Sequence, residues 1–400
     1  MASATRARLP MPPDAVSTRL AWTAWVILTV ITCVGVADKL HDRPHEPLTN
    51  RSEEYASRQW WAEGDLYRPF EREFFLYLPH AAILYSPFHL GPDLLRNVLV
   101  RIVYVGLFAL ALFVFAGLGN PRRRGQRFFL MTLVCIPLAG HSARGAQMNL
   151  PLAAFMLLAT VAIARGRWSW ATVALLVGVV LKPLGVVWLL LAVGLWPRQL
   201  GWRVAVGLIV AAAFPFAFGR PEYVLRQYAD FFHKMTIEVA PKRGFRDIRG
   251  LLVTGLGIQV SHGTLLVVRA VAAVAAFALA LVARKRWNLT GAALAFYVLG
   301  ATYLMLFNPK TEGPTYALLG PAIGVLLAWA VLGLRSLPLA LLLAGITLGI
   351  AFSWEIWGPG QHWFRPLLAL VFLVVVILSV ALSPDGKERC PWVPGETADA

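Results

Sequence analysis

Charged residues are scarce in this chain. They make up 14% of its 400 residues, whereas a soluble globular domain carries about a quarter. Hydrophobic residues contribute 58% and the mean hydropathy is +0.63, so the composition excludes an ordinary soluble protein. The apolar runs are continuous rather than alternating, which favours membrane-spanning helices over barrel strands. The sequence therefore predicts an all-α polytopic membrane protein.

Cysteines and ligand motifs are also rare. The chain has three cysteines, Cys33, Cys135 and Cys390, and their spacing excludes a disulfide framework. It contains no His/Cys pattern at zinc spacing, no Walker lysine loop and no nucleotide-binding glycine fingerprint. These absences give no reason to expect a metal ion or a resident cofactor.

Positive charge is abundant, with a formal net charge of +16 and a pI near 10.3. Many basic residues form short clusters between apolar runs, so they indicate topology rather than a nucleic-acid partner. Twelve apolar runs begin near Leu20, Leu95, Phe128, Met148, Trp168, Leu184, Val204, Thr264, Thr290, Tyr316, Pro338 and Phe364. Twelve spans return the chain to the side on which it starts. The clusters at 122–127, 165–167, 198–203 and 284–286 and Arg335 all fall on that side, which the positive-inside rule makes cytoplasmic.

Segment 168–196 decides this topology. As one tilted helix it would send Arg284, Lys285 and Arg286 outward, against the positive-inside rule. As a hairpin, each leg has about fourteen residues and spans roughly 21 Å, less than the ~30 Å hydrocarbon core. We therefore expect a hairpin whose turn, Lys182-Pro183, lies below the outer surface and is surrounded by protein.

The chain is expected to form one integral domain, 1–383, in the plasma membrane. Its N-terminus predicts an uncleaved first span. Two large outer loops, 38–93 and 220–262, are expected to carry short amphipathic helices. The tail at 384–400 is predicted to be cytoplasmic and disordered.

The first outer loop gathers acids and aromatics in an otherwise basic protein. Glu53 and Glu54 are the favoured candidates for a general base, because an acid near the bilayer surface can take a proton from a hydroxyl. Asp65, Tyr67 and Tyr77 are candidate substrate contacts. The alternatives are that the aromatics anchor the loop at the headgroup level and that the acids are simply solvated.

Two polar features interrupt the apolar runs on the same side. The turn 141–149 offers Arg144 as an anion contact near a helix start, together with Gln147 and Asn149 as substrate contacts. Lys182 costs roughly 2.5 to 3.5 kcal/mol on insertion scales, so it should have a partner or a function. Helix packing by Asn149 and snorkelling by Lys182 are the simpler explanations.

The second outer loop and a late turn add further charge. Arg243, Arg246 and Arg249 are at helical spacing and suit a phosphate, although nonspecific attraction to anionic headgroups would also explain them. The turn 307–316 offers four candidate substrate contacts: Asn308, Lys310, Glu312 and Tyr316. A Lys310–Glu312 ion pair that needs no ligand is the alternative there.

The order of these elements resembles glycosyltransferase family 87, the polyprenol-phosphate-mannose-dependent mannosyltransferases of the C-type glycosyltransferase superfamily. The resemblance runs from Glu53 to about Leu327. It rests on an acid after the first span, Gly64-Asp65-Leu66-Tyr67, Tyr77-x-Pro79, Gly145-x-Gln147-x-Asn149, Lys182-Pro183, the basic outer loop, and Asn308-Pro309 ending in Tyr316.

One departure from the family pattern concerns the base. Family members usually offer an aspartate in the first outer loop, whereas here the neighbourhood reads Asn50-Arg51-Ser52-Glu53-Glu54-Tyr55. Glu53 and Glu54 are candidate replacements, and Asp38 and Asp42 are others. A protein that has lost activity is a further alternative.

The resemblance implies a membrane glycosyltransferase that moves a sugar, mannose in the family, from a polyprenyl-phosphate donor to a glycolipid or glycan hydroxyl on the outer face. The implied mechanism is a single inverting displacement. Glu53 or Glu54 would take the acceptor proton, and cationic residues would stabilise the departing lipid phosphate: Lys182, Arg144, Arg243, Arg246 and Arg249. Membrane lipids, the lipid-linked donor and the acceptor are the expected partners, with no nucleic acid and no metal.

Two other functions stay open. A lipid or solute transporter, or flippase, would also have intramembrane charges and broken helices. It predicts functional charges on both faces or near the midplane, together with a repeat between the two halves, and the sequence shows neither. The other is an inactive relative that scaffolds cell-envelope enzymes.

Overall fold

The computed structural model describes residues 11–42, 51–68, 75–89, 91–236, 246–358, 362–383 and 390–393. Every regular element in these residues is a helix. Seven helical segments are long and apolar enough to cross a membrane: α1 (Asp14–Asp42), α4 (Asp93–Ala116), α9 with η4 (Pro197–Ala217), α12 (His262–Arg286), α13 (Leu289–Phe307), η6–α14–η7 (Gly313–Leu334) and α17 (Phe364–Ala381). The prediction of an all-α polytopic protein is confirmed.

The other five predicted runs are also helical but shorter or more polar. Four are short apolar helices: α6 (Asn149–Ala164), α7 (Trp168–Leu181), η3–α8 (Pro183–Leu195) and α15 (Leu337–Ala351). The fifth, α5 (Arg124–Arg144), contains Pro137 and has arginine at both ends. Nearly all of α6 is buried, so its length is matched to the surrounding protein rather than to lipid.

The predicted hairpin at 168–196 is confirmed. Helix α7 ends at Leu181, and Lys182 is extended (φ −149°, ψ 120°) before the chain turns through η3 (Pro183–Gly185) into α8 (Val186–Leu195). The rings of Trp168 and Trp196 lie 6.1 Å apart, whereas one continuous helix would separate them by about 40 Å. Gly185 permits the reversal, because a Cβ there would lie 2.9 Å from the carbonyl carbon of Gly178.

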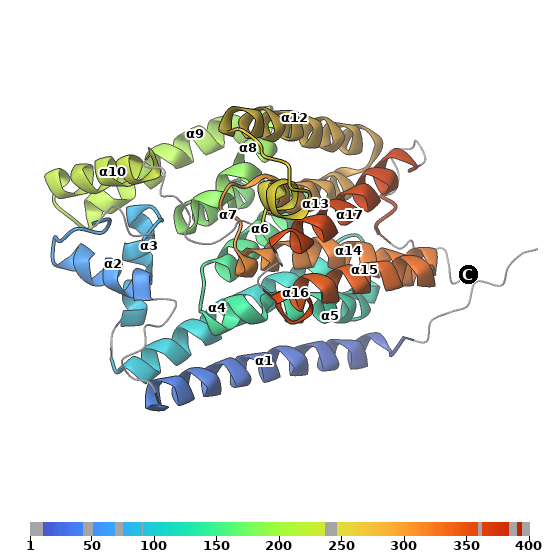
Figure 1. Cartoon of the computed structure of the whole chain (residues 1–400), viewed down its shortest axis with the longest axis horizontal. Coiled ribbons are helices and arrows are strands. Elements are labelled where there is room, and N and C mark those ends of the chain that lie inside the picture. Colours follow the sequence, from blue (N-terminus) through green and yellow to red (C-terminus); the bar gives the residue numbers. More distant parts are fainter. Residues whose placement is uncertain are drawn as a thin grey trace, which may run out of the picture.

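Three helices that do not span form a cap at one end of the molecule: α2 (Arg51–Trp61), α3 (Pro79–Tyr85) and α10 (Pro221–Thr236), at the left of Figure 1. They share a hydrophobic cluster of their own that includes Trp60, Tyr67 and Phe75. The Trp60 indole donates to the Phe218 carbonyl (3.2 Å) and packs on Tyr223. The two large loops are therefore built together.

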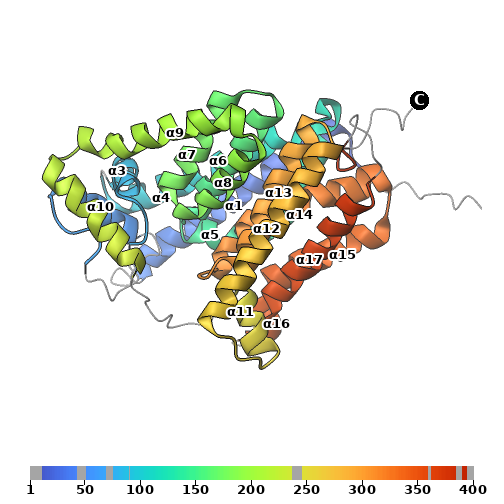
Figure 2. The ribbon, with the colours of Figure 1, turned by 90° about the horizontal axis from the view of Figure 1, so that it is seen from above.

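The membrane helices enclose a central pair and expose two at the rim. Helix α13 and the segment 313–334 are largely buried, whereas α9 and α12 expose most of their length. Their exposed residues, such as Ile209 and Val271, are apolar and suited to lipid. Figure 1 shows α9 and α12 along the upper edge of the molecule, and Figure 2 shows α11 (Ile248–Gly250) and α16 (Ser353–Trp357) at its lower edge.

The tail departs from prediction. Cys390 and Trp392 are buried, so the expectation of disorder is wrong for residues 390–393; residues 384–389 and 394–400 lie outside the described part. The Trp392 indole donates to Ser379 Oγ (3.1 Å), and its ring meets that of Trp287 edge-on at 4.9 Å. Apolar side chains in a polar tail thus anchor it between α17 and the α12–α13 turn.

We expect Trp392→Ala to lower the free energy of unfolding by about 3 to 5 kcal/mol, because it empties a fully enclosed site. The check is thermal or denaturant unfolding of the full chain in detergent. Trp170→Ala is the matched control, since Trp170 is 68% exposed. Equal losses in the two variants would contradict a packed tail.

Candidate active site

Glu53 is a buried acid on the first turn of α2, only 3% exposed. The Ser52 hydroxyl donates to its Oε2 at 2.5 Å, and the Tyr77 hydroxyl also donates to the carboxylate. Burial raises the pKa of Glu53 above its ordinary value, while Ser52, the Lys182 charge and Tyr77 oppose that rise. The result is a desolvated carboxylate held by hydrogen bonds.

Lys182 lies at the bend of the α7–α8 hairpin, close enough to this acid for their charges to interact. Its ammonium donates to Asn149 Oδ1 at 2.7 Å, lies 5.9 Å from the Tyr77 ring centroid, and interacts electrostatically with Glu312 and Glu53. The expectation that Lys182 has partners is therefore confirmed. The structure brings the predicted acid and the predicted cation together from distant parts of the chain.

Asn149 and Gln147 support the lysine. The Asn149 side chain is fully buried at the start of α6, and its amide donates to Gln147 Oε1 (3.0 Å) and Ser142 Oγ (3.3 Å). These bonds leave the Asn149 Oδ1 turned toward Lys182. Asn149 thus orients the Lys182 ammonium. Helix packing alone would not require this hydrogen bond.

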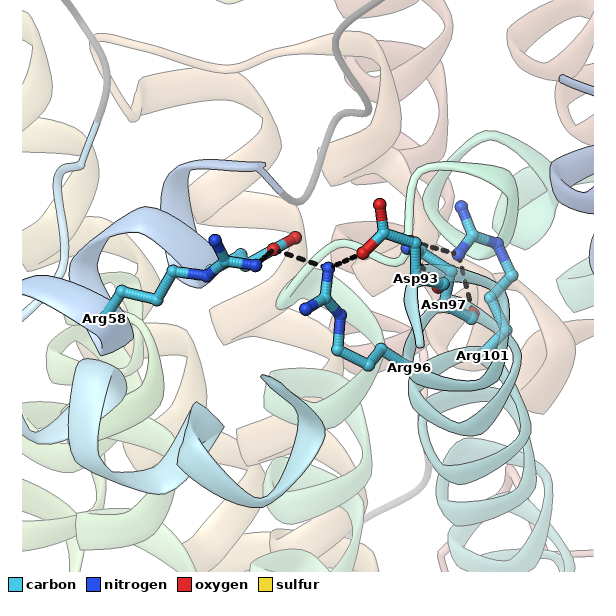
Figure 3. Close-up of polar contacts among 6 residues, drawn as sticks. Arg58, Asp93, Arg96, Asn97 and Arg101 are labelled. Atoms are coloured by element: carbon cyan, nitrogen blue, oxygen red, sulfur yellow. Dashed lines mark hydrogen bonds and ion pairs between the residues drawn. The ribbon is translucent and has the colours of Figure 1, made fainter. Parts of the chain in front are cut away.

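Glu54, the other favoured base, has a different environment. Its Oε1 accepts from Arg58 at 2.7 Å and from Arg96 at 2.8 Å, and both ion pairs are drawn in Figure 3. Asp38 and Asp42 are exposed near the end of α1. Among these four acids, Glu53 alone is buried next to a lysine.

Two residues of the first outer loop play supporting parts. The Tyr67 hydroxyl donates to the Tyr77 carbonyl (2.9 Å) inside the cap cluster, so Tyr67 fixes the tyrosine that contacts Glu53. Asp65 is partly exposed and lies 3.7 Å from Arg68. The structure does not place Asp65 in contact with Glu53 or Lys182.

Two arginines converge on Gly313 in the late turn. A Cβ on Gly313 would lie 2.1 Å from Arg365 Nη1 and 2.6 Å from Arg246 Nη1, so the two guanidinium groups are close neighbours. The Tyr316 hydroxyl donates to the Arg246 carbonyl (2.9 Å), and the Arg365 guanidinium lies over the Tyr316 ring at 5.9 Å. Arg246 and Tyr316, both predicted site residues, therefore cluster with Arg365, and the two arginines form a cationic pair.

Arg365 is not among the residues predicted from the sequence, although an arginine that opens an apolar run was a usable signal. It is 5% exposed, and its Nε donates to Ser353 Oγ at 2.5 Å. Burial, then the charges of Arg246 and Arg365, lower the pKa of nearby His362. Two guanidinium groups held this close suit an oxyanion with more than one charge, such as a phosphate.

The turn between α13 and η6 joins the two clusters. Glu312 interacts electrostatically with Lys182 and Tyr77. The guanidinium groups of Arg246 and Arg365 lie against the next residue, Gly313. Asn308 donates to Thr311 Oγ1 (3.3 Å) and shapes the turn. Lys310 is exposed. Acid, lysine and paired arginines thus form one continuous array.

The other residues predicted to contact a phosphate do not belong to the arginine pair at Gly313. Arg246 precedes the three-residue helix α11, which carries Arg249, so these arginines do not share the longer helix that their spacing suggested. Arg249 and Arg144 are exposed, and the Arg144 carbonyl accepts from Arg101 at 2.6 Å. Arg243 lies outside the described residues.

Comparison with known proteins identifies the family. The sequence model of glycosyltransferase family 87 matches residues 75–309, more than half of the chain. The chain belongs to glycosyltransferase family 87. With its membrane-spanning helices, it is a multi-pass membrane glycosyltransferase. The match includes Tyr77, Asn149 and Lys182, while Glu53 and Arg365 lie outside it.

Similarity beyond the family match is slight. The crystal structure of ArnT from Cupriavidus metallidurans in the apo state is similar to this glycosyltransferase with a TM-score of 0.43 and 16% identity, covering 90% of this chain and 77% of that one. No curated protein matches the chain.

Within the described residues of this family 87 protein, no group of three or more His, Cys, Asp and Glu residues is arranged to hold a metal ion. The charged groups that the structure does bring together are mostly cationic. They suit anion binding rather than metal ligation.

We expect Gly313→Ala to weaken phosphate binding roughly tenfold or more, because its methyl group would push one or both guanidinium groups aside and a charge-assisted hydrogen bond contributes about 1.5 to 3 kcal/mol. The fold should persist, since the displaced atoms end flexible side chains. The measurement is the rise in melting temperature with added inorganic phosphate or pyrophosphate.

Gly140→Ala is the matched control, because a Cβ at Gly140 meets nothing within 4 Å. It should keep the wild-type response to phosphate. An unchanged response in Gly313→Ala would show that the arginine pair does not bind the anion.

Proposed function

We propose that this glycosyltransferase transfers mannose from a polyprenyl-phosphate donor to a hydroxyl of a glycolipid or glycan acceptor. The observation that carries the proposal is the desolvated Glu53 beside Lys182, joined through Glu312 and Gly313 to the pair Arg246 and Arg365. A base and a cationic seat for a phosphate are the two parts that such a transfer needs.

Glu53 is the proposed general base. Its carboxylate takes the proton of the acceptor hydroxyl as that oxygen attacks the anomeric carbon of the donor. The bond between this carbon and the phosphate oxygen breaks, and its electron pair stays on the phosphate. One displacement inverts the configuration at the sugar. Burial makes Glu53 a stronger base, and Ser52 and Tyr77 hold it in place.

Lys182, Arg246 and Arg365 are proposed to stabilise the departing lipid phosphate. Asn149 and Ser353 accept hydrogen bonds from the Lys182 ammonium and the Arg365 guanidinium, and the Tyr316 hydroxyl holds the backbone carbonyl of Arg246. With the groups held before the reaction, little reorganisation is needed as negative charge develops. Such groups supply the electrostatic stabilisation that a metal ion gives in other transferases. We therefore propose a reaction that needs no divalent metal.

The proposed site faces the outside of the plasma membrane. Support comes from the positive-inside rule: the basic cluster at 122–124 lies shortly after the end of α4 and the cluster at 284–286 forms the last turn of α12, whereas α4 begins at Asp93 near the α2 cap. A lipid-linked donor would reach a site at that membrane surface laterally.

The direct test uses the purified full-length protein, labelled polyprenyl-phosphate-mannose, a mixed glycolipid extract and a chelator. We expect release of polyprenyl phosphate together with mannosylated lipid. Lys182→Met and Arg365→Gln should each lower kcat about 100-fold or more, as loss of a transition-state donor does. Lys285→Met, at an exposed position on α12, should not.

Three results would overturn parts of this proposal. Strict dependence on a divalent ion would remove the metal-free mechanism. Full turnover by Lys182→Met would remove Lys182 from the site. Absence of transfer in the wild type would favour an inactive relative or another donor.

The pH dependence tests the base. Since Glu53 must be ionised to accept a proton and burial raises its pKa, we expect kcat/KM to fall with falling pH at a midpoint above the ordinary glutamate pKa of about 4.3. Glu53→Gln should lose about 10²- to 10⁴-fold in rate and lose this acid limb. Glu54→Gln should keep the limb; loss of it there instead would make Glu54 the base.

A further inference from the structure

A polar stripe runs along one face of membrane helix α4. Asp93, Arg96, Asn97 and Arg101 are spaced three, four and eight residues from the first, which places them on one helix face. Arg101 lies about 12 Å along the helix from Asp93, and Arg96 and Arg101 are 8% and 2% exposed. Buried charge at this depth is costly and calls for a partner or a function.

The outer part of the stripe holds the helix that carries Glu53. Arg96 Nη2 donates to Glu54 Oε1 at 2.8 Å and also pairs with Asp93 (Figure 3). Glu54 is the neighbour of Glu53 on α2, so this partly buried ion pair fixes α2 against α4. The other partner of Glu54, Arg58, is 56% exposed in its side chain and should contribute little.

The inner part of the stripe holds the turn that leads to Asn149. Arg101 Nη1 donates to the carbonyl (2.8 Å) and the side-chain oxygen (3.2 Å) of Asn97, and its Nη2 donates to the Arg144 carbonyl at 2.6 Å. Figure 3 shows Asn97 and Arg101 adjacent on this helix. Arg144 ends α5, and the short turn after it delivers Asn149, which binds Lys182.

We propose that Arg96 and Arg101 are positioning residues that set the separation of Glu53 and Lys182. Arg96 links α2, the helix of Glu53, to α4. Arg101 links to α4 the turn that precedes Asn149, the hydrogen-bond partner of Lys182. The α4 stripe is thus a common frame for the two reactive groups, although neither arginine contacts them in the structure. The inference rests on the proposed roles of Glu53 and Lys182.

The kinetic test compares Arg96→Gln, Arg96→Lys, Glu54→Gln and the control Arg58→Gln in the mannosyl-transfer assay. We expect Arg96→Gln to lower kcat at least tenfold with the donor KM within about twofold. Arg96→Lys should recover most of the rate, and Arg58→Gln should match the wild type. The double variant of Arg96→Gln and Glu54→Gln should be no slower than the slower single variant, because both remove one interaction.

A second measurement does not depend on activity. Hydrogen exchange of the full chain should rise in residues 51–61 for Arg96→Gln and in residues 144–149 for Arg101→Gln, and in neither segment for Arg58→Gln. If Arg96→Gln fails to fold, Glu54→Gln removes the same ion pair and gives the same comparison, while exchange in Arg96→Lys should stay close to that of the wild type.

The outcomes separate the two proposals. A wild type without mannosyl transfer would remove the proposed function, while exchange would still decide whether the stripe holds α2 and the turn. Exchange in Arg96→Gln equal to that in Arg58→Gln would overturn the positioning role. So would an unchanged kcat, or losses that multiply in the double variant.

Discussion

The burial of Glu53 next to Lys182 is the constraint on which the rest of the site depends. An isolated charge is costly to remove from water, and each of these two becomes tolerable only beside an opposite charge and hydrogen-bond partners. The hydroxyls of Ser52 and Tyr77 donate hydrogen bonds to Glu53, and Asn149 accepts one from Lys182. The cap, the start of α6 and the α7–α8 hairpin must therefore be in place together.

The hairpin shows how a membrane protein can place a lysine below its surface. Breaking a helix at Lys182 frees backbone groups that hydrocarbon could not satisfy, so the bend must lie within protein. The Gly185 amide returns to the Lys182 carbonyl at 3.0 Å, and Trp188 of the second leg stacks on Tyr297 of the buried helix α13. Packing against neighbouring helices thus replaces the contacts that a full-length span would make with lipid.

The arginine pair at Gly313 complements this arrangement. Arg246 and Arg365 repel each other across a site that only a small residue allows, and an anion between them would relieve that repulsion. Glu312 connects this pair to Lys182. This arrangement suits the proposed transfer, in which negative charge grows on the departing phosphate.

Composition and apolar run length determined the helical membrane fold, and the positive-inside rule correctly separated the hairpin from a single helix. Chemical type alone also singled out Glu53, Asn149 and Lys182. The preference for Glu53 over Glu54 as the proposed base needed tertiary structure, because only packing shows that Glu54 pairs with Arg96 on another helix. Arg365 and the packed Trp392 were likewise decided by contacts with distant segments, which local pattern and hydropathy do not encode.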